Sequence, residues 1–179
     1  MKAITLWCSL ALFSAGTLLV AAWTVDTTKA RVAFSVGGPF GTVHGTFTGL
    51  EAAIRFDPAD LAGSTIQASI DAKTVSSGIG LRNHHLRSED QWLDTDKYPR
   101  ISYRSTKIEK TASGYKLTGN LTIKDVTKPV DLPFTFTANG NAGVFRGQFS
   151  FRRIDFHLGK PGGSVGDVIT IDLDVPVKK

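Results

Sequence analysis

The chain has 179 residues, of which 41% are hydrophobic and 21% are charged, and its formal net charge is +5. This near-average composition excludes a disordered tail, a coiled coil and a collagen-like repeat, because each of these needs a strongly biased sequence. The basic residues are scattered rather than grouped, so no nucleic-acid partner is expected. A dispersed surplus of this size is compatible with transient contact at an anionic membrane surface.

The first 22 residues have the form of a secretory signal. Lys2 is followed by an apolar run from Ile4 to Phe13, and small residues lead to Ala21 and Ala22. This order predicts a cleaved signal peptide over residues 1–22 and a periplasmic protein formed by residues 23–179. An uncleaved membrane anchor is the alternative, since the run is almost long enough to span a bilayer.

Cleavage at this point leaves a chain without thiols. The only cysteine, Cys8, lies inside the predicted signal. Disulfides, thiolate metal sites and cysteine nucleophiles are therefore excluded from residues 23–179.

Apolar and polar residues alternate with a period of two through most of residues 23–179, which is typical of half-buried strands. Turn residues such as Gly37-Gly38-Pro39 and Asn139-Gly140-Asn141 separate the alternating segments. Eight or nine short strands of this kind predict an antiparallel sandwich or barrel. No long amphipathic helix is available to cover a sheet face, so we expect the sheet to close on itself.

One segment, residues 74–99, lacks the alternation. Ser88 and Gln91 have the spacing of a capping box ahead of Trp92, which predicts one or two short helices here. Excursions of this length in a compact β domain are usually lids or mouths, so we expect this one to lie at a binding site.

The inward face of the predicted sheet is rich in aromatic residues, but small residues are interleaved with them. Gly45, Ala68, Gly119 and Gly147 fall on the same face as the large side chains. Each such neighbourhood is either a packed pair of large and small residues or a gap. The pattern alone leaves a filled core and a ligand cavity as equal alternatives.

The sequence offers no catalytic constellation, metal site or cofactor motif. His84 and His85 are adjacent, whereas metal ligands need a spacing at which they converge. No G-x-S-x-G motif is present, and the glycine-rich stretch around Ser164 is not followed by a helix that would hold a phosphate.

The sequence resembles the YceI family of exported, lipocalin-like proteins along essentially the whole of residues 23–179. The most specific match is the segment 119–130, GNLTIKDVTKPV. The chain departs from the family pattern at Asp125 and His157, where glycine is usual, which concerns loop geometry rather than the pocket. The other matching landmarks are Trp23-Thr24-Val25-Asp26, Gly45-Thr46-Phe47, Ile54-Arg55-Phe56-Asp57-Pro58, Ala68-Ser69-Ile70-Asp71, His85-Leu86-Arg87-Ser88, Trp92-Leu93-Asp94, Tyr98-Pro99 and Arg153-Ile154-Asp155-Phe156.

The resemblance implies an eight-stranded antiparallel barrel, with a short helical excursion between two central strands, whose apolar pocket binds a polyisoprenoid lipid or an isoprenoid quinone. It implies no catalytic activity and no cofactor. Alternation then predicts the ligand-binding residues Phe34, Val36, Phe47, Phe56, Tyr103, Leu121, Phe134, Phe136, Phe149 and Phe151. The excursion predicts the pocket rim His84, His85, Leu86 and Trp92.

Two other functions fit the same sequence. An enzyme could use His84 or His85 as a general base on a small apolar or lipid-like substrate. A barrel packed solid by its own side chains would act through protein contacts at its surface. The sequence leaves a homodimer open.

Overall fold

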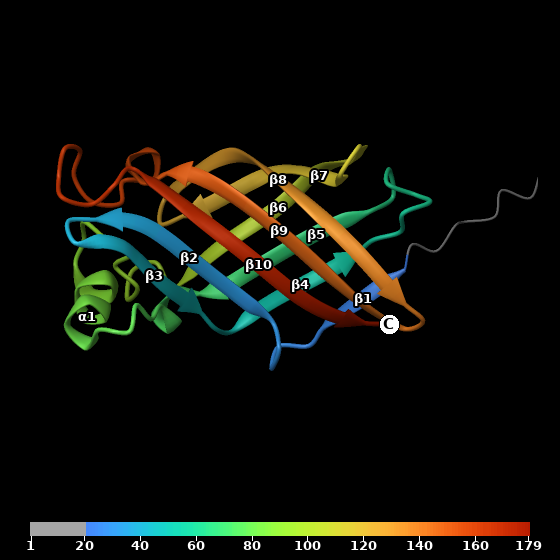
Figure 1. Ribbon diagram of the computed structural model, residues 1–179, viewed down its shortest axis with the longest axis horizontal. Coiled ribbons are helices and arrows are strands. Elements are labelled where there is room, and N and C mark those ends of the chain that lie inside the picture. The colour runs from blue at the N-terminus through green and yellow to red at the C-terminus, as the bar shows by residue number, and fades with distance from the viewer. Residues whose placement is uncertain (1–20) are drawn as a thin grey trace, which may run out of the picture.

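The strands pair in a ring, and every pairing between neighbouring strands is antiparallel (Figure 1). The structure is a computed structural model that describes residues 21–179. The strands are β1 (Ala22–Val25), β2 (Arg31–Gly38), β3 (Gly41–Phe47), β4 (Leu50–Arg55), β5 (Thr65–Asp71), β6 (Arg100–Thr111), β7 (Gly114–Ile123), β8 (Val126–Asn139), β9 (Ala142–Arg152) and β10 (Val168–Lys178). The helices are α1 (Gly80–Ser88) and two short 3-10 helices, η1 (Ala72–Thr74) and η2 (Arg153–Phe156).

The ten strands fill only eight positions in the ring, because at two positions a pair of consecutive strands takes the place of one long strand. Both β1 and β2 pair with β10, one after the other, and the turn that follows Asp26 separates them. In the same way β3 and β4 follow each other around Gly49, whose φ of +71° favours glycine. Pairing of Val25 with Val177 closes the ring. The predicted eight-stranded antiparallel barrel is confirmed.

Small inward residues are covered by large ones on the neighbouring strand. A Cβ atom at Gly45 would lie 2.2 Å from the ring of Phe34, and one at Gly119 would lie 2.6 Å from the ring of Tyr103. These glycines therefore let aromatic rings lie flat against the sheet wall. At these positions the interleaved small residues form packed pairs and are not gaps.

One end of the barrel is filled by aromatic side chains. Phe56 is completely buried, and its ring makes edge-on contacts with Tyr115, Phe134, Phe136 and Phe145 at centroid distances of 5.1–5.6 Å. The Trp23 indole closes the same end and donates a 2.9 Å hydrogen bond to the Phe56 carbonyl. Such edge-to-face arrangements suit the aromatic quadrupole, and we call this group the aromatic plug.

The other end carries the excursion between β5 and β6 (Figure 1). Its helix α1 ends at Ser88, so the sequence prediction of a helix that begins there is wrong. The Ser88 hydroxyl donates to the carbonyl of His84 one turn back, at 2.9 Å, and does not cap a following helix. The chain after Ser88 instead forms turns bonded to the helix, with Leu93 N donating to Leu86 O at 3.0 Å. Over residues 21–179, no helix has the length and apolar character needed to cross a bilayer.

Candidate functional site

A cavity of about 850 Å³ occupies the barrel between the aromatic plug and the excursion. Its volume lies in the range of about 300–1,000 Å³ that is typical of small-molecule pockets. Phe134 and Phe145 belong to both the plug and the cavity lining, so they form its floor. The barrel is therefore solid at one end and hollow at the other.

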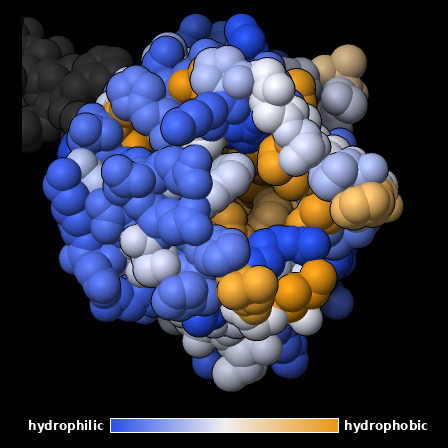
Figure 2. Space-filling view, turned by 90° about the vertical axis from the view of Figure 1, so that its left-hand side faces the viewer, coloured by the Kyte–Doolittle hydropathy of each residue, from blue (hydrophilic) through white to orange (hydrophobic). Residues whose placement is uncertain are grey.

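The cavity opens at the end of the barrel that carries α1. Figure 2 faces this end and shows hydrophobic residues around and inside a hollow. At this end β3 pairs with β2 alone and does not continue the ring to β5. The edge of β3 that faces away from β2 pairs with the excursion at one point only, where Thr46 and Ser76 exchange backbone hydrogen bonds of 2.8 and 2.9 Å. We call this opening the mouth; it lies among the β2–β3 turn, α1 and the β9–β10 loop.

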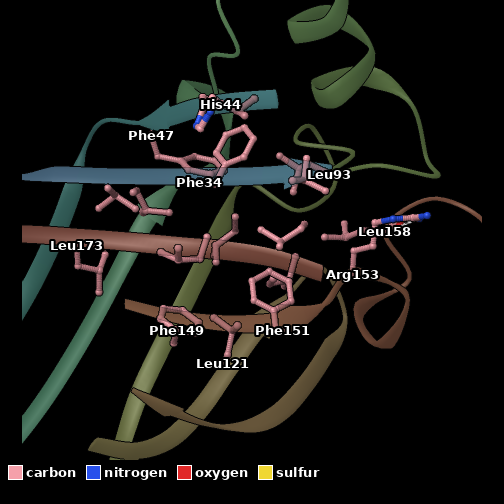
Figure 3. Close-up of a pocket in the computed structure, with 18 of the residues that line it drawn as sticks. Phe34, His44, Phe47, Leu93, Leu121, Phe149, Phe151, Arg153, Leu158 and Leu173 are labelled. Atoms are coloured by element: carbon pink, nitrogen blue, oxygen red, sulfur yellow. Dashed lines mark hydrogen bonds between the residues drawn. The ribbon is translucent and has the colours of Figure 1, made fainter. Parts of the chain in front are cut away.

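Eight of the ten side chains predicted to bind a ligand line the cavity. They are Phe34, Val36, Phe47, Tyr103, Leu121, Phe134, Phe149 and Phe151, and Figure 3 shows several of them from different strands around one space. Phe56 and Phe136 do not line it, because both belong to the aromatic plug. Alternation correctly predicts that they point inward, but it does not report their position along the barrel axis.

Three of the four predicted rim residues, His85, Leu86 and Trp92, also line the cavity. His84 does not, because it lies on another face of α1, where its ring is 3.5 Å from the Ser88 hydroxyl. Adjacent residues on a helix point about 100° apart, so the two histidines do not share the site.

The sequence reasoning missed lining residues of two kinds. Ile169, Ile171 and Leu173 on β10 show the same alternation as the predicted residues, so that pattern could have identified them. Leu93 and Leu158 come from irregular segments, where no periodicity indicates which side chains turn inward.

The polar groups of the lining are few, and two of them, Tyr103 and Arg153, are already engaged within the wall. The Tyr103 hydroxyl donates within the sheet wall, 2.9 Å from the Val130 carbonyl and 3.1 Å from that of Leu117. Burial raises the pKa of this phenol well above its ordinary value, so Tyr103 is neutral near pH 7. Among residues 21–179, no Asp or Glu lines the cavity.

Arg153 is the second engaged group, and it holds the β9–β10 loop in place. The residue is 1% exposed, and its guanidinium donates to four backbone carbonyls, those of Leu158, Lys160, Val165 and Gly166, at 2.7–3.1 Å. Asp167 pairs with it at 3.3 Å. Figure 3 shows the guanidinium turned away from the side chains that line the cavity. Arg153 therefore shapes the wall, and four of the five N–H donors of its guanidinium are used in holding the loop.

The arrangement suits binding rather than bond making. The lining is mainly apolar, and the His85 imidazole lies 3.8 Å from the Glu89 carboxylate. Within the described part of the chain, no three His, Cys, Asp or Glu side chains gather as metal ligands would. The site offers an apolar ligand a largely apolar compartment with one open end.

The backbone at the mouth explains one departure from the YceI pattern. His157 ends η2 in the left-handed region with φ of +55°, a conformation that glycine adopts without strain. At the other departure, it is Lys124 and not Asp125 that has the positive φ, of +57°.

Known proteins match both the sequence and the fold. A UPF0312 protein of Yersinia enterocolitica is 28% identical over 173 residues, covering 92% of this chain and 90% of its own length. The crystal structure of BcnA from Burkholderia cenocepacia is similar with a TM-score of 0.80 at 29% identity, covering 86% of this chain and 99% of that one.

A polyisoprenoid binding domain from Saccharophagus degradans has a TM-score of 0.66, covering 88% of this chain and 98% of that one. At 15% identity this likeness shows the fold alone. The model of the YceI-like domain matches residues 23–177. The barrel, its open cavity and this match together show that the chain belongs to the YceI-like domain family.

Proposed function

We propose that this protein is a non-enzymatic carrier that holds a polyisoprenoid or isoprenoid-quinone-like amphiphile in the cavity of its barrel. The observation that carries the proposal is the cavity of about 850 Å³, apolar along its length, closed by the aromatic plug and open at the mouth. The polyisoprenoid binding domain with the same fold supports this choice of ligand.

The energetics favour a long hydrocarbon chain in such a site. Each buried methylene gains about 0.8 kcal/mol on leaving water, so one five-carbon isoprene unit gains on the order of 4 kcal/mol before ordering costs. The cavity is closed at the floor by Phe134 and Phe145, so the tail enters first and the polar head group stays at the mouth. Such lipids reside in bilayers, and a carrier must meet a bilayer to load them.

Two variants of neighbouring residues on β5 test the site. Ala68 lines the cavity, whereas Gln67 is exposed on the outer face. Ala68→Phe places a ring in the cavity and should reduce the lipid that is extracted from the purified protein and identified by mass spectrometry. Gln67→Phe adds the same ring outside and should leave the bound lipid unchanged. Wild-type protein without bound lipid and without saturable uptake of an isoprenoid quinone would contradict the proposal.

The same experiment addresses the catalytic alternative. His85 lies at the mouth, where it can only contact a head group, and His84 faces elsewhere. We therefore expect a protein with both His84→Gln and His85→Gln to retain its lipid and its fold. Loss of a substrate-converting activity in this double variant would instead favour an enzyme.

We further propose that residues 1–22 are a cleaved signal and that the carrier functions in the periplasm. Residues 1–20, with Cys8, lie outside the described residues, so the support comes from the apolar run and from the family match, which begins at residue 23. The intact mass of protein recovered from a periplasmic fraction tests this. A mass that includes residues 1–22 would contradict cleavage.

A further inference from the structure

Large apolar side chains are exposed at one end of the molecule. Phe40, at the tip of the β2–β3 turn, is fully exposed; Leu81 is 67% exposed, and Ile79, beside it at the start of α1, is 50% exposed. Val168, at the first position of β10, is 53% exposed at the same end. Over residues 21–179, these four are the only exposed large hydrophobic residues. Exposed apolar side chains without a function would be scattered over both ends of the barrel. Because these four lie together at the mouth, they indicate an interaction site there.

The segments that carry these side chains are free of acidic residues. The sequences 37–44, 78–88 and 157–166 border the mouth and contain no Asp or Glu, although the chain has 16 acidic residues. They contain Arg82, Arg87 and Lys160, together with four histidines. Arg82 lines the cavity mouth, and its side chain makes no hydrogen bond or ion pair with any other residue of 21–179. The segments around the mouth thus carry both protruding apolar side chains and basic side chains.

Acidic residues flank these segments: Glu89 and Asp90 follow α1, and Asp155 and Asp167 stand on either side of 157–166. Glu89 lies 3.8 Å from His85, and Asp167 is engaged with Arg152 and Arg153 at 3.9 and 3.3 Å, so two of the four are paired with basic side chains. Apolar side chains that protrude between cationic ones are the pattern by which proteins attach to the surface of an anionic bilayer.

We propose that the mouth docks on the surface of an anionic lipid bilayer, with Phe40, Ile79 and Leu81 inserted among the lipids and Arg82 and Lys160 at the head groups. The proposal rests on the carrier function, because docking places the opening of the cavity against the source of its ligand. A bilayer fits better than a protein partner because the exposed side chains come from two separate segments, the β2–β3 turn and the start of α1, and fluid lipid can fill the space between them.

Flotation with vesicles tests the proposal on the purified protein after removal of its signal. Wild type should float with vesicles of phosphatidylcholine and phosphatidylglycerol, float poorly with phosphatidylcholine alone, and dissociate as salt is added. Phe40→Ser and Leu81→Ser should each lower the partition coefficient roughly tenfold, because each removes one inserted side chain. Both side chains are exposed, so circular dichroism should show unchanged folding.

Charge reversal at the two ends provides a matched pair. Lys160 lies in the β9–β10 loop at the mouth, and Lys110 lies at the end of β6 beside the aromatic plug; both are exposed. Lys160→Glu should weaken binding to the anionic vesicles several-fold, and Lys110→Glu should leave it unchanged. Equal effects of the two reversals would overturn the orientation proposed here.

Bound lipid is measured in the same samples, so the two proposals fail separately. A wild-type protein that contains lipid but does not float overturns docking and leaves the carrier function intact. A protein that floats but never contains or takes up lipid overturns the carrier function. Photo-crosslinking from position 40 that captures a protein and no lipid would also overturn the bilayer as the partner.

Discussion

Replacing Arg153 tests whether one buried cation maintains the wall of the cavity. Arg153→Met keeps a long side chain but removes every donor to the carbonyls of the β9–β10 loop. Leu158 and Val165, which line the cavity, belong to that loop. We therefore expect this variant to lose stability and to loosen the loop at the mouth.

The magnitude follows from the number and burial of the bonds. Hydrogen bonds to a charged group contribute about 1.5–3 kcal/mol each, but water can replace the donor at the exposed residues Lys160 and Gly166. A loss of about 3–5 kcal/mol is typical when one partner of a buried charged network is removed. For a chain of this size that corresponds to a fall in Tm of roughly 6–20 °C.

Thermal unfolding and limited proteolysis provide the two measurements. Cleavage within residues 157–166 should accelerate in Arg153→Met, and the Tm should fall by the stated amount. Asp167→Asn is the matched control, since it leaves the bonds to the carbonyls in place and removes only the ion pairs to Arg152 and Arg153, whose carboxylate is 43% exposed and which are each worth about 0–1 kcal/mol. A Tm of Arg153→Met within about 2 °C of wild type, or equal losses in the two variants, would refute the carbonyl network as the cause.

Three smaller predictions concern the barrel itself. Gly119→Ala should cost about 1–3 kcal/mol in urea unfolding, because its Cβ would lie 2.5 Å from the Arg104 carbonyl oxygen; an unchanged midpoint would contradict this close approach. His157→Gly should stabilise the protein by up to about 1 kcal/mol by relieving the left-handed backbone, and a lower Tm would show that the imidazole contributes instead. Hydrogen bonds from Thr28 and Lys29 lower the pKa of Asp26 from 3.8, so its contribution to stability is present above that pH and is lost as the pH falls through the lowered pKa. The Tm values of wild type and Asp26→Asn should therefore converge in acid, and a gap that persists at about pH 2 would refute this.

The position of the mouth connects the fold to the proposed function. The same break in pairing that leaves the edge of β3 free also separates the β2–β3 turn from β5, where α1 and its neighbours insert. That arrangement places Phe40, in the β2–β3 turn, and Leu81, in α1, at the end of the barrel where the cavity opens.

Local alternation was enough to predict a closed antiparallel barrel, because a pleated strand repeats every two residues and this sequence supplies no helix to cover a sheet. Eight of the ten binding residues proposed from the same rule line the cavity, among them Phe34, Phe149 and Phe151. The predicted short helix of the excursion is present, but the capping-box pattern misplaced it, because Ser88 ends the helix instead of beginning one.

Only the tertiary structure distinguished the hollow part of the barrel from the solid part. Phe56 and Phe151 look alike in the sequence, since each is an inward phenylalanine next to a turn, yet one is at the centre of the plug and the other lines the cavity. Their difference is set by the shear of the strands, which determines the side chains that meet at each level along the axis. The partners of Arg153 likewise lie 5 to 14 residues away in an irregular loop, and no periodic pattern encodes a contact of that kind.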